Sequence, residues 1–333
     1  MEPLNLITDV AGIAVGHAED ARIASGVTAL IFAAPATASV AIHGGAPGLR
    51  DSALLAPEMT VEQIDALVLS GGSAFGLDAM GGAMAHLRAR GRGFRIRDVN
   101  VPIVPGAILF DLLNGGDKAW GDPPAYWHLG RAAAAAAQPG RFQLGTHGAG
   151  YGATTANLKG GIGSASIQTS TGFTVGALVA VNAVGRATIG DGPHFWAAPY
   201  EHDGEFGGLG WPQIFPADAA ALKIKGDEPE NTTIAIVATD AALTKGQAKR
   251  LAVAAQDGMA HALRPAHAAM DGDTVFAAGT GTASTAPSPR DLAEIGMLAA
   301  DCLARAIARG VYEATPLAFP GALPSWREKF GKR

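Results

Sequence analysis

The sequence is poor in several residue types that mark specialised protein classes. It contains one cysteine, Cys302, in 333 residues, so an internal disulfide framework is excluded and a reducing, cytoplasmic setting is expected. We expect this cysteine to be buried on the apolar stripe of a helix. Lys and Arg number 25 against 30 Asp and Glu, a net charge of −5 without any long basic block. Binding to nucleic acid is therefore not expected.

Long apolar runs are also missing. The stretch at residues 175–184 is broken by glycine and ends well short of the about 18–20 residues that a membrane span needs. The N-terminus has neither the basic start nor the apolar run of a signal peptide. The nine histidines show no paired helical spacing, which argues against a metal site. We expect no membrane partner, no metal and no cofactor.

What the chain does have is material for a core and for tight turns. Hydrophobic residues make up 48% of the sequence, enough for one large or two ordinary domains. The 45 glycines follow no short period and gather where apolar runs end, for example at 71–72 and 160–161. Glycine permits the turns and close backbone approaches that such positions need. This pattern is typical of a compact α/β protein.

The apolar periodicity predicts alternating strands and helices without an internal repeat. Predicted strands lie at residues 13–15, 27–33, 38–42, 66–69, 162–168, 173–181, 186–189 and 232–238. Predicted helices follow an N-cap at Ser73, cover a small surface alanine run at 132–137, span 245–263 after a Thr244 cap, and begin at the Ser288–Asp291 capping box. A long loop at 193–216 and a polar linker at 217–230 complete the pattern, which suggests layered α/β sheets.

Two familiar motifs carry little weight here. Residues 71–75 read Gly-Gly-Ser-Ala-Phe and resemble a nucleophile elbow, but the final glycine is displaced to Gly76. The late histidine that such a hydrolase requires would be His261, inside a predicted helix, or His267. Residues 148–153 formally match G-x-G-x-x-A, yet no clear strand precedes them and no helix pattern follows. Neither motif supports a function alone.

The informative segment is the junction of Asn231 and Thr232, where the polar linker runs directly into a predicted core strand. If the chain is cut at this bond, the Thr232 hydroxyl gains an α-amino group on its own residue. Such an amine has an ordinary pKa of about 7.7–8, so it can act as a general base near neutral pH. Taken alone, Thr232 is better explained as an ordinary threonine at the start of a strand.

A resemblance to a known family favours the catalytic alternative. Similar blocks occur in order at residues 7–17, 44–48, 69–77, 159–163, 181–183 and 236–240. Together they resemble the DmpA-type peptidase family, which includes D-aminopeptidases, β-aminopeptidases and nylon-oligomer hydrolases. The resemblance implies an αββα sandwich, like that of ornithine acetyltransferases and related to the N-terminal-nucleophile hydrolases. It also implies one domain over 1–333, cleaved into a larger subunit 1–231 and a smaller subunit 232–333, and a tetramer-like homo-oligomer.

The resemblance further assigns the nucleophile. In the family it is the first residue of the smaller subunit, serine in the aminopeptidases and threonine after asparagine in the nylon-oligomer hydrolases. Asn231 and Thr232 match the second type. Asp271 and Asp273 match the pair of polar residues that assists the nucleophile, and their spacing on an extended segment predicts that they point to one side. Their ordinary alternative is a solvated turn.

Lys159 and Asn182 are assigned to the site by the same resemblance. An Asn182 amide near the end of a core strand can donate to the oxyanion of a tetrahedral intermediate, and a satisfied structural asparagine is the alternative. A Lys159 ammonium near the Thr232 amine would lower the pKa of that amine, whereas a lysine facing solvent would not. Phe110 stands where the family often has tyrosine, so a substrate hydrogen bond from that position is lost or replaced.

These residues predict an amide hydrolase for a small amide or peptide. The Asn231 and Thr232 junction favours 6-aminohexanoate oligomers or similar linear amides, for which the aromatic loop at 195–211 could line a channel. An aminopeptidase for D- or β-amino-acid amides is the near alternative. Acyl transfer of the ornithine acetyltransferase type, and a non-enzymatic, unprocessed binding protein, are the remaining hypotheses.

Overall fold

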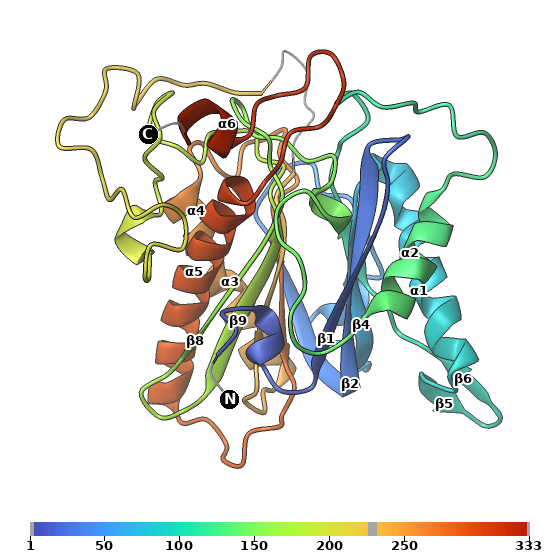
Figure 1. Cartoon of the computed structure of the whole chain (residues 1–333). Coiled ribbons are helices and arrows are strands. Elements are labelled where there is room, and N and C mark those ends of the chain that lie inside the picture. Colours follow the sequence, from blue (N-terminus) through green and yellow to red (C-terminus); the bar gives the residue numbers. More distant parts are fainter. Residues whose placement is uncertain (1–2, 226–231, 332–333) are drawn as a thin grey trace.

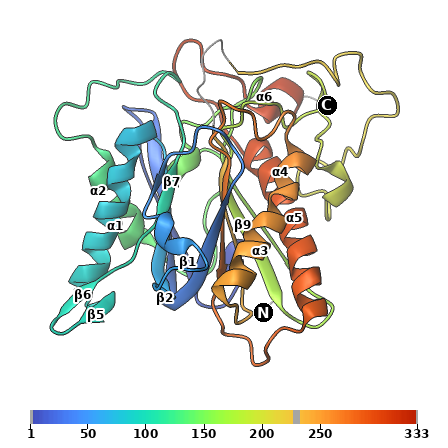
Figure 2. The ribbon, with the colours of Figure 1, turned by 180° about the vertical axis from the view of Figure 1, so that it is seen from behind.

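The structure, a computed structural model, describes residues 3–225 and 232–331. Asn231 and residues 226–230 of the predicted linker lie outside these ranges. Strands form the middle of the molecule, and helices cover them on both sides (Figures 1 and 2). The predicted αββα arrangement is confirmed by this layering.

The strands and helices have the following bounds. The strands are β1 (Ile13–Asp20), β2 (Ser25–Ile42), β3 (Leu49–Arg50), β4 (Ile64–Ser70), β5 (Phe94–Ile96), β6 (Val99–Val101), β7 (Gly106–Ile108), β8 (Ile162–Gln168), β9 (Thr174–Ala180), β10 (Ile234–Thr239) and β11 (Thr274–Gly279). The α-helices are α1 (Asp78–Ala89), α2 (Tyr126–Ala136), α3 (Lys245–Ala255), α4 (Asp257–Ala262), α5 (Pro289–Tyr312) and α6 (Trp326–Phe330). Short 3-10 helices are η1 (Ile7–Asp9), η2 (Ala53–Leu55), η3 (Ser73–Leu77), η4 (Gly148–Gly150) and η5 (Ala198–Tyr200).

One long strand, β2, connects the two sheet layers. The strand order is β3-β7-β4-β2-β11-β10-β9-β8, with β1 paired to β2, so β2 pairs with β4 on one side and β11 on the other. Its register against β4 shifts between Ile31 and Ala36. The two strands predicted at 27–33 and 38–42 are therefore one strand of 18 residues. The residues between them carried turn signals because the strand is irregular there.

Side chains along the strands alternate between separate apolar cores. In β10, Ile234 and Ile236 point into the core between the sheet layers, whereas Ala235 and Val237 point into the core beneath α3, α4 and α5. A further core lies between α1, α2 and the strands β2 and β4. Successive strand residues face opposite sides, so a strand that is apolar throughout is buried on both faces. This explains why these strands read as continuous apolar runs.

Of the three predicted helix caps, Thr244 and Ser288 are confirmed and Ser73 is wrong. The Thr244 and Ser288 side chains accept hydrogen bonds from the third residue of their helices, as predicted. The helix predicted over 245–263 is instead broken at Gln256 into α3 and α4. Ser73 does not cap a helix, because it has a left-handed φ of 50° and opens η3. The α-helix follows only at Asp78.

Three further expectations need correction. The alanine run is part of α2, whose Ala133 and Ala134 are buried, so it is not a small surface helix. Residues 186–189 form isolated bridges with Arg264 and Phe195 and no strand. Phe195 stacks on Trp326 within a core cluster, so this part of the aromatic loop supports the fold rather than a channel. Cys302 is fully buried on α5, as predicted.

None of the helices in the described ranges has the length and hydropathy that crossing a bilayer requires.

Candidate active site

Several predicted site residues meet at one edge of the sheet, where β10 and β11 begin and β9 and β2 end. Continuing the register of β9 and β10 by two residues places Thr232 opposite Asn182, and continuing that of β10 and β11 places it beside Gly272. The Thr232 backbone N–H donates to the Asn182 carbonyl at 3.0 Å. Strand order therefore brings together residues that are far apart in the sequence.

The two aspartates flanking Gly272 have different surroundings. Asp273 Oδ1 accepts the backbone N–H of Thr233 at 3.0 Å, and its Oδ2 accepts that of His267 at 2.8 Å. Burial, followed by the neighbouring Asp273 carboxylate, raises the pKa of Asp271 from 3.8 to about 8. Two buried carboxyl groups in contact do not both ionise readily. Near neutral pH this raised pKa favours the protonated form of Asp271.

Asn182 connects the Thr232 backbone to a pocket. Its Nδ2 donates to the Phe110 carbonyl at 2.9 Å, and its Oδ1 accepts the Thr154 backbone N–H at 3.0 Å and the Lys225 ammonium at 2.8 Å. The residue is fully buried. An amide has two N–H donors, and the bond to Phe110 uses one of them, so the other could donate to a ligand. These contacts hold the amide in one orientation.

Lys159 is fully buried, so it is not the solvent-facing lysine of the alternative hypothesis. Its ammonium donates to three backbone carbonyls, those of Gly150, Ala153 and Gly160, at 2.9, 2.8 and 2.8 Å. Burial lowers its pKa to about 7, with Asp111 opposing this shift. In the register of β8 and β9, Gly160 lies opposite Asn182. Lys159 thus fixes the loop that borders Asn182, and it titrates near neutral pH.

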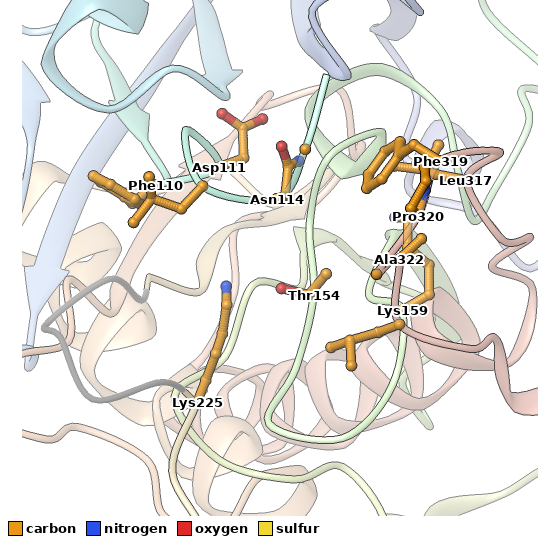
Figure 3. Close-up of a pocket in the computed structure, with 14 residues that line it drawn as sticks. Phe110, Asp111, Asn114, Thr154, Lys159, Lys225, Leu317, Phe319, Pro320 and Ala322 are labelled. Carbon is orange, nitrogen blue, oxygen red and sulfur yellow. The ribbon is translucent and has the colours of Figure 1, made fainter. Parts of the chain in front are cut away.

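A pocket of about 490 Å³ lies beside this edge (Figure 3). Its walls come from the segment after β7, from the segment before α6, and from the neighbourhood of Lys159. The lining residues are Phe110, Asp111, Leu113, Asn114, Gly115, Thr154, Lys159, Lys225, Leu317, Phe319, Pro320, Gly321, Ala322 and Leu323. Three of them are the residues that Asn182 contacts through its side chain. Phe110, predicted to bind substrate, is thus in the pocket wall.

Asp111 is a buried pocket residue that the sequence did not single out. Its Oδ2 accepts the Ser25 hydroxyl at 2.7 Å, and its Oδ1 accepts the Gly72 backbone N–H at 2.8 Å. Burial raises its pKa, while Lys118 acts in the opposite direction. A Cβ at Gly71 would lie 2.3 Å from Asp111 Oδ2. The glycines of the apparent nucleophile elbow therefore allow close approach to Asp111.

Lys225 and His267 were also missed as site residues. Lys225 fell inside the predicted linker, where polar composition concealed its contact with Asn182. His267 was considered only as a partner for a serine nucleophile. Its position four residues before Asp271 was the available signal. The segment 317–323 carries no periodicity that could have placed it at the pocket.

Comparison with known proteins identifies the family. The chain matches peptidase family S58 over residues 5–322. A Mycobacterium bovis protein named as an uncharacterized aminopeptidase is 41% identical over 98% of both chains. A 6-aminohexanoate-oligomer endohydrolase of Agromyces is 27% identical over 82% of this chain and 74% of its own.

Solved structures agree on the fold. A β-aminopeptidase of Burkholderia aligns with a TM-score of 0.68 and 21% identity, covering 99% of this chain and 95% of that one. The L-aminopeptidase D-Ala-esterase/amidase of Ochrobactrum anthropi, described as a variant of the Ntn hydrolase fold, gives 0.68 and 20% over the same shares. With a family match along almost its whole length and a relative at 41% identity, the chain belongs to peptidase family S58.

Proposed function

We propose that this protein is an amide hydrolase whose nucleophile is Thr232, released as a new N-terminus by cleavage of the bond after Asn231. The observation that carries this proposal is the position of Thr232, buried at the sheet edge between Asn182 and Gly272. The paired carboxyls of Asp271 and Asp273 lie on the same edge. The contact of Asp273 with the Thr233 backbone N–H supports a role in fixing the nucleophile.

In the first reaction, Thr232 Oγ attacks the Asn231 carbonyl carbon. The C–N bond breaks, the nitrogen takes a proton, and the acyl group is now an ester on Oγ. Water then hydrolyses the ester, leaving a carboxylate on Asn231 and a free amine and hydroxyl on Thr232. This supplies the base that the next reaction needs.

In the second reaction, the same oxygen attacks a substrate amide while the Thr232 amine takes its proton. The second N–H of Asn182 would donate to the oxyanion of the tetrahedral intermediate. The substrate amine leaves with a proton, and water cleaves the acyl-enzyme. Protonated Asp271 would act as a hydrogen-bond donor, and Asp273 would hold the backbone at Thr233 through its Oδ1.

An aminopeptidase is the first substrate assignment, because the relatives at 41% identity carry that name. Hydrolysis of 6-aminohexanoate oligomers, the assignment that the sequence favoured, is second, since the relatives so named are 27% identical. The junction of Asn231 and Thr232 and the apolar pocket residues Leu113, Leu317 and Phe319 suit such methylene chains. Adding ornithine to an acetyl-donor assay separates hydrolysis from acyl transfer.

The decisive experiment is intact-mass analysis of the purified protein. We expect two fragments that meet between residues 231 and 232, and a full-length, inactive chain for Thr232→Ala. Thr233→Val is the matched control, because the Thr233 hydroxyl is buried and has no hydrogen-bond partner in the described part of the chain. Removing it should spare cleavage. A wild-type chain that stays full-length and is fully active as an amidase would exclude the proposal, as would an uncut, inactive chain with binding alone.

A further inference from the structure

His267 lies behind the aspartate pair, on the side away from the β10 backbone. Its ring Nδ1 is 3.0 Å from Asp273 Oδ2, and its backbone N–H donates to the same oxygen at 2.8 Å. The ring nitrogen is close to this oxygen but is not aligned for a hydrogen bond. The opposite oxygen of Asp273 accepts the Thr233 backbone N–H. One carboxylate thus links an imidazole directly to the residue after the nucleophile.

The backbone at His267 is arranged for this contact. Its φ of 57° is left-handed, a conformation that histidine adopts more readily than most residues but still uncommonly. Nδ1 is shielded from solvent although the side chain as a whole is 22% exposed. His267 thus combines an uncommon backbone conformation with a buried ring nitrogen that faces the fully buried carboxylate of Asp273.

We propose that His267 is a positioning residue that holds the negative charge on Asp273 and thereby keeps the shared proton of the pair on Asp271. This inference rests on the proposed function, because it assigns the protonation state in which the pair serves Thr232. The asymmetry has a geometric origin. Each carboxyl receives two backbone N–H donors, those of Thr233 and His267 at Asp273 and those of Gly272 and Val184 at Asp271. Asp273 in addition has the imidazole of His267 at 3.0 Å.

The titratable groups around His267 and its neighbour His43 come from four parts of the chain, before β11, after β2, in α3 and in α4. Asp273 lies before β11, with Asp271 beside it. His43, at the end of β2, packs edge-on against the His267 ring with centroids 5.2 Å apart. Burial and then the charge of His267 lower the pKa of His43, to which Lys249 and Asp257 contribute with opposite signs. Two imidazolium rings at this distance would repel each other, and the lowered pKa of His43 disfavours charge on that ring.

Removing the ring should change the titration of the carboxyl pair. A cationic or donor group near a carboxyl lowers its pKa, so the loss of the imidazole should raise the pKa of Asp271 further. The pH at which Asp271 loses its proton, about 8 in the native protein, should then move upward. A residue with only a packing role would reduce activity by one factor at every pH and would leave this titration in place.

His267→Asn is the primary variant, because asparagine tolerates the left-handed φ and keeps the backbone N–H to Asp273. His267→Gln is the second variant, in case the first folds poorly. His43→Gln is the matched control, since the His43 side chain is exposed and packs against the His267 ring, and the substitution keeps the His43 backbone N–H that donates to the Asp273 carbonyl. Each is measured for the pH dependence of hydrolysis and, in a Thr232→Ala background, for the pH dependence of the unfolding temperature.

We expect the His267 variants to shift the pH profiles upward by about 1 unit, with about a tenfold loss of kcat at neutral pH, and His43→Gln to leave the profiles within about 0.3 unit. Profiles of His267→Asn and His267→Gln that superimpose on the parent profile after scaling would overturn the proposal. The stability titration involves no bond cleavage. It therefore reports on His267 even if uncut, active wild-type protein were to refute Thr232 as the nucleophile.

Discussion

Gly272 lies directly against Thr232: a Cβ atom at position 272 would meet the Thr232 hydroxyl oxygen at 2.6 Å and its methyl carbon at 2.9 Å. Contacts this short do not occur, so any side chain here would displace the threonine or the strand. The site therefore requires glycine at position 272, between Asp271 and Asp273, to leave room for Thr232.

We predict that Gly272→Ala will slow cleavage and hydrolysis by about 100-fold, the loss expected for a displacement of the reacting group by about 1 Å. Overpacking should lower the free energy of unfolding by about 1–3 kcal/mol. Gly296→Ala, where a Cβ would meet only Ala254 Cβ at 3.4 Å, is the control and should be neutral or slightly stabilising. Kinetics and urea unfolding of both variants check this. Wild-type rates in Gly272→Ala would contradict it.

Asp271 should make folding stability fall as pH rises. Its pKa is raised from 3.8 to about 8, so between these values the folded chain holds a proton that the unfolded chain has released. Stability contributed by this proton is complete below pH 3.8 and is lost as pH approaches about 8. Asp271→Asn should flatten this part of the stability profile and abolish more than about 90% of hydrolysis. Thermal unfolding across this pH range tests the first claim, and an unchanged slope would refute it.

Lys159 should give a slope of the opposite sign. Burial lowers its pKa from 10.5 to about 7, so between these values the unfolded chain holds a proton that the folded chain lacks. Stability therefore rises with pH across this window. Lys159→Met should remove the rise, and should also cost about 3 kcal/mol or more because three buried carbonyls lose their donor. A variant as stable as the wild type at pH 7 would contradict this account.

Asn182→Asp should separate the donor role of the side chain from its acceptor role. The aspartate can still accept from Thr154 and Lys225, but it has no N–H for Phe110 or for an oxyanion. We expect kcat to fall by about 100- to 1,000-fold with little change in KM. Lys225→Met, which removes only one donor to Asn182, should cost less than about tenfold. Equal losses in the two variants would mean that Asn182 acts through its acceptor contacts.

The sequence was sufficient to predict most of the longer strands and two of the three helix caps, because these depend on local periodicity and on residues within one turn. It did not predict β11, and the αββα layering came from the resemblance. The neighbours of Thr232 were not predictable in this way. Asn182 is opposite Thr232 only because β9 and β10 pair in one particular register, and Gly272 is adjacent only because β11 follows β10 in the sheet. The resemblance to a family supplied those residues, and strand pairing gives the physical reason for their proximity.

Polar residues in irregular segments were the hardest to interpret. Lys225 sits in a stretch whose composition resembles an exposed linker, yet its ammonium contacts a fully buried asparagine. Asp111 follows a short strand, and its burial depends on close packing by Gly71 from another segment. No local pattern encodes such contacts, since each depends on where a distant backbone passes.

The order of strands has a consequence for a chain that cuts itself. β10 and β11, which follow residue 232, are inserted between β9 and β2, which precede it, and are hydrogen-bonded to both. α5 closes over β8 and β9 from the same later part of the chain. Scission at the edge would therefore sever the backbone without dividing the protein: the two polypeptides would stay interlocked as one folded body, and the new chain end would remain fixed where its first residue was already held.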